Sequence, residues 1–396
     1  MAMNESITNL IKEKSEAYLE DMIRVRRQIH RYPELGFDEW KTSALVKEEL
    51  TKAGIPWTAM ADTGVVGLIE GKNPGKVVLI RADMDALEIQ EETGLGFASE
   101  REGIMHACGH EGHTAGLVGA AKILNDLKDQ FNGTVKLMFQ PSEEYIPGAE
   151  RMVKEGVLEN PKVDFAIGHH LHGPAPKGVI QMRAGGMTAA PDKFTFKIRA
   201  IGGHGSTPYL CTDVIALTSQ AITMMYSTLN RKLGPVDEAV MSICSLHAGK
   251  EYNILPGEVT AVGTIRTFDP AIRKMIPETM EAILKAVTSV EDAEYELIME
   301  DEIGPVINDP WVTKMVKEAA VKIVGEDHVE ELKTGSLGGE DFSAVTELVP
   351  SCYFYVGVSE DMENPTVLHS STFCWDDTIL KTSAAILAQA ALEVLK

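Results

Sequence analysis

The chain has 396 residues, of which 44% are hydrophobic and 24% charged, a balance typical of a globular protein with two or three domains. The 59 aspartates and glutamates outnumber the 37 lysines and arginines, so the net charge is −22. A surface of that sign repels phosphate backbones and anionic lipids, and we therefore expect neither a nucleic acid nor a membrane as a partner.

Two further features predict where the protein works. The N-terminal residues are charged where a signal peptide needs an apolar core, and no apolar run is long enough to span a bilayer. The five cysteines are an odd number and lie far apart in the chain, which argues against a disulfide framework. Together these features favour the reducing cytoplasm.

The first part of the chain alternates predicted helices and strands. An amphipathic helix over residues 5–31 ends before Pro33. The following elements are expected, in order, to be a helix over 39–53, strands over 65–70 and 76–82, a helix over 114–127, a strand over 134–139, a helix over 149–155 and a strand over 164–168. This alternation is typical of an α/β domain, whose sites form at the ends of its strands.

The pattern changes near residue 185. Residues 186–298 read as strand, helix, strand, strand, helix, strand, which predicts a smaller α+β, ferredoxin-like domain. Helix and strand alternation returns over 299–396, so the first domain, begun by residues 1–185, is discontinuous. The expected fold is an α/β domain with a central mixed sheet flanked by helices, into which the smaller domain is inserted.

The most informative stretch is 105–115, because it places one cysteine and three histidines within eight positions. Cys108 and His110 are two residues apart, so both side chains can point to one side of a turn. A thiolate and an imidazole that converge favour a transition metal. The alternative is a buried cysteine beside histidines that only satisfy local hydrogen bonds.

Two of the predicted strands lead into further candidate groups. Glu143 and Glu144 follow one strand, and in a metal hydrolase one such carboxylate binds the metal while its neighbour acts as a base. A solvated pair on a loop is the alternative. His169, His170 and His172 follow the next strand, and each could be a ligand or a structural residue.

Six motifs together carry a family resemblance that covers nearly the whole chain. They are Arg27…His30…Pro33-Glu34-Leu35, Arg81-Ala82-Asp83-Met84-Asp85-Ala86-Leu87, His106-Ala107-Cys108-Gly109-His110, Gln140-Pro141-Ser142-Glu143-Glu144, Gly202-Gly203-His204 and Glu340-Asp341-Phe342-Ser343. In this order and spacing they resemble the M20 metallopeptidase family. The likeness is strongest to its amidohydrolase branch, which includes N-acyl-amino-acid amidohydrolases, hippurate hydrolases and auxin-conjugate hydrolases.

The resemblance implies a hydrolase with two divalent metal ions. Its implied metal ligands are Cys108, His110, Glu144, His170 and His369. His170 is preferred to His169 because it follows Gly-x, as the family's histidine does. Glu143 would be the general base that takes a proton from a metal-held water, and Asp85 would orient a ligand or the metal pair. The thiolate favours zinc, with manganese, nickel and cobalt as alternatives.

The inserted domain carries the other implied site residues. His204 resembles a histidine that stabilises the oxyanion and that a partner subunit often supplies, which implies a homodimer or homotetramer. Asn253 and Arg266 resemble positions that meet the substrate carboxylate, although Arg266 could instead form an ion pair at a strand end. The chain departs from the family pattern at Glu88, Glu111, Tyr209 and Ser371. Tyr209 and Ser371 could reshape the substrate pocket.

The resemblance implies hydrolysis of an N-acyl amino acid to a carboxylic acid and a free amino acid. A metallo-carboxypeptidase or dipeptidase acting on short peptides with the same machinery is the near alternative. A non-catalytic metal-binding scaffold is a remote one, because Glu143 and all five implied ligands are present.

Overall fold

The computed structural model describes residues 2–145, 147–301 and 303–396, and it divides into two units. Unit 1 contains the chain up to Met187, Ile307–Lys333 and Asp341–Lys396, and unit 2 contains Thr188–Val306 and Thr334–Glu340. The sequence placed the second junction between residues 298 and 299. That position is wrong, because strand β13 (Ala293–Asp301) crosses it and pairs with β8 (Ala190–Ala200) of unit 2 along its whole length.

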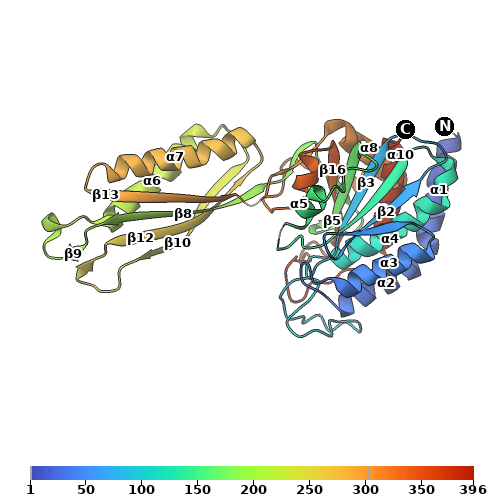
Figure 1. Cartoon of the computed structure of the whole chain (residues 1–396), viewed down its shortest axis with the longest axis horizontal. Helices are drawn as coiled ribbons and strands as arrows, with labels where there is room; N and C mark the ends of the chain where they lie inside the picture. Colours follow the sequence, from blue (N-terminus) through green and yellow to red (C-terminus); the bar gives the residue numbers. More distant parts are fainter. Residues whose placement is uncertain (1, 146, 302) are drawn as a thin grey trace. The chain divides into compact units, whose positions relative to one another are not determined.

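Unit 1 is built on a mixed sheet, as the sequence predicted, and the described residues give this sheet eight strands (Figure 1). Parallel strands β4, β3, β5 and β16 form its centre, and antiparallel pairings flank them. Its order is β1 (Trp57–Met60), β2 (Gly64–Glu70), β4 (Thr134–Gln140), β3 (Val77–Asp83), β5 (Phe165–Pro176), β16 (Ser351–Ser359), β6 (Ile180–Met182) and β15 (Val329–Glu331). The central strands are almost wholly buried, which explains their continuous apolar runs.

Helices cover both faces of this sheet. The helices of unit 1 are α1 (Ala2–Ala17), α2 (Leu19–Arg31), α3 (Trp40–Lys52), α4 (His110–Asp126), α5 (Gly148–Lys154), α8 (Pro310–Val324), α9 (Ser343–Thr346) and α10 (Ile379–Val394). Val78, Ile80 and Ala82 of β3 share one core with apolar residues of α4 and α10. Arg81 lies between them in sequence and reaches Asp341, just before α9, on the opposite face.

The structure corrects three predicted boundaries in unit 1. The helix expected over residues 5–31 is two helices, with Tyr18 between them. Helix α4 starts at His110 instead of residue 114, so His110 lies in its first turn. Strand β5 runs on to Pro176, so the three histidines expected after its end lie inside it.

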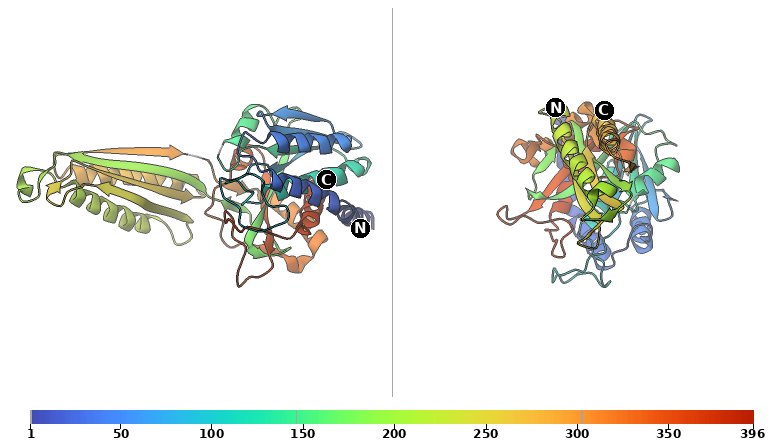
Figure 2. Two further views of the ribbon diagram at one scale, coloured as in Figure 1. Left: turned by 90° about the horizontal axis from the view of Figure 1, so that it is seen from below. Right: turned by 90° about the vertical axis from the view of Figure 1, so that its left-hand side faces the viewer.

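Unit 2 has the predicted α+β, ferredoxin-like topology. Its antiparallel sheet has the order β10 (Ala239–Ala248), β12 (Glu258–Thr267), β8 and β13. Helices α6 (Val214–Lys232) and α7 (Pro270–Thr288) pack against each other and share a core with this sheet, along which Figure 2 shows them running. A short pair, β9 (Gly203–His204) with β11 (Ile254–Leu255), also belongs to unit 2, whereas most residues of the pair β7 (Gly185–Thr188) and β14 (Val306–Asn308) belong to unit 1. Within the described part of the chain, no helix combines the length and apolarity needed to cross a membrane.

Candidate active site

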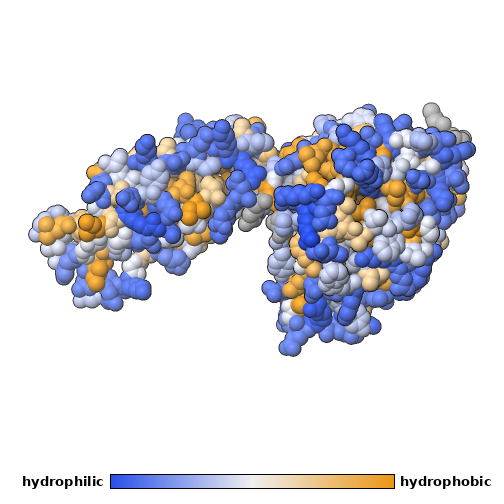
Figure 3. All heavy atoms as spheres, viewed as in Figure 1, coloured by the Kyte–Doolittle hydropathy of each residue, from blue (hydrophilic) through white to orange (hydrophobic). Residues whose placement is uncertain are grey.

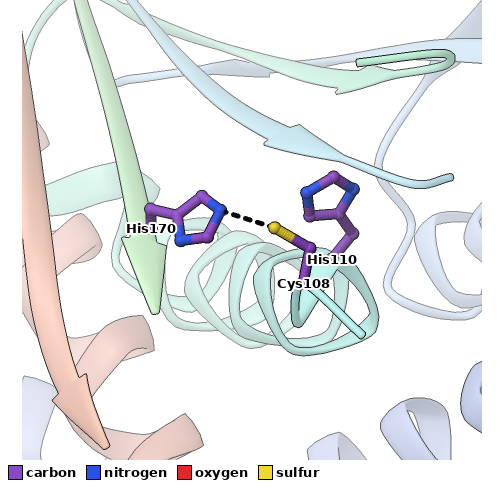
Figure 4. A group of neighbouring side chains, drawn as sticks. All are labelled: Cys108, His110 and His170. Carbon is purple, nitrogen blue, oxygen red and sulfur yellow. Dashed lines mark hydrogen bonds between the residues drawn. The ribbon is translucent and has the colours of Figure 1, made fainter. Parts of the chain in front are cut away.

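Five side chains from four separate segments of unit 1 meet at the ends of its central strands. Cys108 precedes α4 and His110 opens it, while Glu144 follows β4, His170 lies in β5 and His369 lies in a loop after β16. The Cys108 Sγ atom is 3.3 Å from Nε2 of His170 and 3.3 Å from Nε2 of His369. Figure 4 shows His170 directed from its strand at the thiol beside His110. All five residues that the resemblance implied as ligands are therefore brought together.

Hydrogen bonds orient two of the imidazoles. Nδ1 of His170 lies 2.5 Å from the Leu171 carbonyl oxygen and donates to it, so Nε2 carries no proton toward Cys108. Nδ1 of His110 lies 3.1 Å from Asp85 Oδ1, which leaves its Nε2 facing the carboxylates of Glu143 and Glu144. Such partners fix the ring orientation of metal-binding histidines.

Two buried polar atoms in this cluster form no well-angled hydrogen bond with a described residue, although the one on Glu144 lies within ion-pair distance of His369. They are Nε2 of His110 and Oε1 of Glu144, which lie 3.8 Å apart. In a tetrahedral zinc site with ligand distances of 2.0–2.3 Å, neighbouring donor atoms are about 3.3–3.8 Å apart. Four donor pairs of this cluster have that spacing, so the residues present fit a divalent metal. The pairs are Cys108–His170, Cys108–His369, His369–Glu144 and His110–Glu144.

The glutamate pair is not a solvated loop feature. The side chains of Glu143 and Glu144 are only 13% and 9% exposed. Glu144 Oε1 lies 3.3 Å from Nε2 of His369, and Oε2 of Glu143 lies 4.0 Å from Nε2 of His110. Asp85 accepts a hydrogen bond from the Glu144 backbone N–H at 2.9 Å while its other oxygen holds His110.

A second layer of buried residues was missed from the sequence. Nε2 of His113 accepts the backbone N–H of Leu171 at 2.9 Å, so its Nδ1 carries the proton and donates to Asp83 Oδ1 at 2.6 Å. Arg81 donates to the other oxygen of Asp83 at 2.7 Å. The available signals were that Asp83 shares a strand face with Asp85, and that His113 is one helical turn after His110.

Strand alternation places His169 on the face of β5 opposite His170 and His172, and contacts further along the strand separate His172 from His170. His170 faces Cys108, whereas His169 stacks on Phe354 and is fully buried with no hydrogen-bond partner in the described chain. His172 stacks on Tyr355, with ring centroids 4.2 Å apart. Only His170 of the three reaches the cluster.

Burial and local charge shape the protonation of this cluster. Burial, followed by the charge of Glu144, raises the pKa of the Cys108 thiol well above its usual range. Burial alone would lower the pKa of His110, but the negative charge of Asp83 raises it well above its ordinary value. Burial and the neighbouring His113 lower the pKa of His170. A divalent cation that replaces protons here would satisfy the buried negative charges.

The remaining predicted site residues belong to unit 2. His204 pairs with Ile254 in the β9–β11 ribbon, and the next residue, Gly205, donates its N–H to the Asn253 carbonyl at 2.9 Å. Tyr209 is 80% exposed beside them. Arg266 lies near the other end of the sheet, where it pairs with Pro191, about 27 Å along β12 from its first residue. Within unit 2, Arg266 is therefore not brought together with His204 and Asn253.

Comparisons with known proteins agree with this geometry. Residues 79–393 match the model of peptidase family M20/M25/M40. An N-acyl-L-amino acid amidohydrolase of Geobacillus stearothermophilus is 43% identical over 77% of this chain and 81% of its own length. Thermostable carboxypeptidase 1 of Saccharolobus solfataricus is 38% identical over 100% of this chain and 99% of its own. The crystal structure of the YxeP protein of Bacillus subtilis, a dinuclear metal-binding peptidase of the M20 family, matches with a TM-score of 0.83 at 32% identity, covering 96% and 99% of the two chains.

Sequence motifs, fold and family model thus lead to one class. The chain belongs to peptidase family M20/M25/M40, and with it to the metal-dependent hydrolases that cleave amide bonds.

Proposed function

We propose that this protein hydrolyses the amide bond of N-acyl amino acids, releasing a carboxylic acid and a free amino acid. The observation that carries the proposal is that Cys108, His110 and Glu144 converge and that a second carboxylate, Glu143, lies beside them. The similarity to an N-acyl-L-amino acid amidohydrolase supports this choice of substrate.

In this proposal, Cys108, His110, Glu144, His170 and His369 hold two divalent metal ions. Cys108 would hold a metal ion together with either histidine, because its sulfur contacts both His170 and His369. Bound metal ions would polarise the scissile carbonyl and lower the pKa of a water molecule. The sulfur ligand favours zinc, and manganese, nickel or cobalt are the alternatives to test.

Glu143 is the proposed general base. Its carboxylate takes a proton from the attacking water and returns it to the departing nitrogen, so that one group serves both steps. Asp85 holds both His110 and the Glu144 backbone, and it thereby fixes the base relative to the ligands. His204 is the proposed donor to the oxyanion, and Asn253, Arg266 and Tyr209 are the proposed contacts of the substrate.

We further propose that the protein acts as a homodimer, or as a homotetramer built from such dimers. His204 and Arg266 lie toward opposite ends of the unit 2 sheet, so a site that uses both needs two copies of the chain. Strand β10 is an edge of this sheet and exposes Val240 and Leu246. Figure 3 shows apolar side chains on unit 2, including the end that carries β9. An exposed apolar edge strand is suited to pairing with a second copy.

The spread-out free cysteines support a cytoplasmic location.

The second candidate function is carboxypeptidase or dipeptidase activity, favoured by the full-length similarity to a thermostable carboxypeptidase. We would incubate the protein with N-acetyl, N-benzoyl and longer N-acyl amino acids and with dipeptides, supplying zinc, manganese, nickel or cobalt separately. Mass spectrometry would identify the amine released. Release from acylated amino acids alone supports the proposal, and release from dipeptides alone favours the peptidase.

Glu143→Ala tests the assigned base. We expect bound metal to stay at the wild-type amount while kcat falls by about 10²–10⁴-fold, the usual contribution of proton transfer. Metal content by mass spectrometry and steady-state kinetics measure the two effects. A near-normal kcat in Glu143→Ala would show that Glu143 is not the base. Turnover by the wild-type protein after its metal is removed would reject the metal-dependent mechanism.

A further inference from the structure

The residue before the glutamate pair has an unusual backbone. Ser142 has φ of +50°, in the left-handed region that residues other than glycine rarely adopt. It lies at the point where β4 has ended and the chain turns to present Glu143 and Glu144 to one cluster. On a regular strand, two adjacent side chains would point to opposite faces. The turn at Ser142 is therefore part of what brings both carboxylates to the same place.

Glu39 holds this turn from the start of α3. Its Oε1 accepts the Ser142 backbone N–H at 2.8 Å, and its Oε2 accepts the Thr63 hydroxyl at 2.6 Å. Glu39 is fully buried, and it occupies the N-cap position of α3 without capping the helix. Its side chain is thus directed away from its own helix and toward the loop that follows β4.

Glu34, and not Glu39, caps the start of α3. Its carboxylate accepts the backbone N–H groups of Lys41 at 3.0 Å and of Thr42 at 2.9 Å, together with the Thr42 hydroxyl at 3.1 Å. These bonds satisfy the exposed N–H groups at the start of α3. The Pro33-Glu34-Leu35 motif, to which no role was assigned from the sequence, therefore anchors the helix start and leaves Glu39 available to Ser142.

A glycine in the same segment lets it approach the turn closely. A Cβ atom added at Gly36 would lie 2.4 Å from Ser142 Oγ and 2.8 Å from its Cβ. Any side chain at residue 36 would consequently push Ser142 away. Glu39 and Gly36 thus contact the same residue through two independent interactions, a hydrogen bond and a close van der Waals approach.

We propose that Glu39 is a positioning residue of the active site, which fixes the left-handed turn at Ser142 and so aims Glu143 and Glu144 at the metal cluster. This inference rests on the proposed roles of Glu143 as base and Glu144 as ligand. Asp85 accepts the Glu144 N–H two residues further on, so buried carboxylates hold the backbone on both sides of Glu143. Burial raises the pKa of Glu39 to about 7, so a neutral acceptor of the same shape should replace it well.

The test compares Glu39→Ala with Glu39→Gln, in which the amide oxygen can still accept the Ser142 N–H. We expect Glu39→Ala to lower kcat and zinc affinity by about 10–100-fold each, as for other residues behind metal ligands, with little change in KM. Glu39→Gln should stay within about threefold of wild type. Hydrogen–deuterium exchange at the Ser142 amide should accelerate in Glu39→Ala and not in Glu39→Gln.

Glu49→Gln is the matched control, because Glu49 is a buried carboxylate on the same helix that contacts α2 and α4 instead of this turn. It should lower stability while leaving kcat, zinc affinity and Ser142 exchange unchanged. If Glu39→Ala does not fold, Gly36→Ala tests the same turn, and Ser142→Gly in that background should restore zinc affinity by removing the clash.

The inference is overturned if Glu39→Ala shows the same Ser142 exchange rate and the same zinc affinity as the wild-type protein. If Glu39→Ala does not fold, the same result in Gly36→Ala overturns it. Both readouts are independent of turnover. If the wild-type protein cleaves none of the amides supplied, the proposed function fails, while exchange and zinc affinity still decide the role of Glu39.

Discussion

At the scale of single residues, Cys108 is the centre of the site. Its sulfur contacts two imidazoles from different segments, and its pKa is raised by burial and by Glu144. A buried cysteine that served only for packing would need no such neighbours. Its surroundings are those of a side chain that exchanges its proton for a metal ion.

Cys108→Ser should therefore weaken zinc binding by more than about 100-fold, since a hydroxyl is a poorer ligand than a thiolate at neutral pH. Titration against a chromophoric chelator would measure the affinity. Cys374→Ser is the control, because Cys374 is exposed and lies in the segment that follows His369. Equal zinc affinity in the two variants would remove Cys108 from the ligand set.

At the scale of elements, helices α2, α3 and α4 share one buried carboxylate. Glu49 of α3 accepts hydrogen bonds from Arg24 of α2 at 2.7 Å and from Lys122 of α4 at 2.9 Å, and Lys52 lies 3.1 Å away. Burial alone would raise the pKa of Glu49, but these three cations lower it to about 2. A buried carboxylate paired in this way holds the three helices in register.

The lowered pKa makes this contribution dependent on pH. Because the folded pKa is below the unfolded value, the stabilisation is present above pH 4.5 and is lost as the pH falls toward 2. Glu49→Gln should therefore lower the free energy of unfolding by roughly 2–3 kcal/mol at pH 7, and by about half as much at pH 3. Urea unfolding at several pH values would measure it.

Glu48→Gln is the matched control for this prediction, since Glu48 is 59% exposed and pairs with the same Lys52. Its effect should stay within about 0.5 kcal/mol at every pH. If Glu49→Gln lowers the free energy of unfolding by the same amount at pH 3 as at pH 7, then the shape of Glu49 and not its charge makes it stabilising.

At the scale of the whole molecule, the proposed catalytic residues are divided between two units. Cys108, Glu143 and the other proposed ligands belong to unit 1, whereas His204 and Arg266 belong to unit 2. If His204 acts on the site of a partner copy, dimer formation and catalysis are linked, because neither copy has a complete site by itself.

A hybrid dimer of one Glu143→Ala chain and one His204→Ala chain tests this arrangement. Each homodimer should be inactive, while the hybrid, isolated with two different affinity tags, combines one intact Glu143 with one intact His204. We expect it to recover about half of the wild-type activity per dimer, because one of its two sites is complete. An inactive hybrid would mean that His204 acts within its own chain.

Much of the fold was predictable because its signals are local. The buried run Val-Val-Leu-Ile of β3 and the helical spacing of apolar residues in α2 are each set by neighbours within a few positions. The ends of helices and strands were harder to predict where polar site residues interrupt the apolar pattern of an element. The histidines of β5 made its second half resemble a loop, so the predicted strand was too short. The glycine and histidines at the start of α4 likewise led to a predicted helix that began one turn too late.

The sequence by itself pointed to the class of protein and to the proposed ligands, because six motifs occur together in the order and spacing of the M20 family, whereas each motif alone also allowed a purely structural role. Only the tertiary structure decided which of His169 and His170 faces Cys108, and that His113, Asp83 and Glu39 support the site. The physical reason is that a local pattern specifies the face of an element, whereas Glu39 and Ser142 are 103 residues apart. Their hydrogen bond exists only because the folded chain brings the start of α3 against the turn after β4.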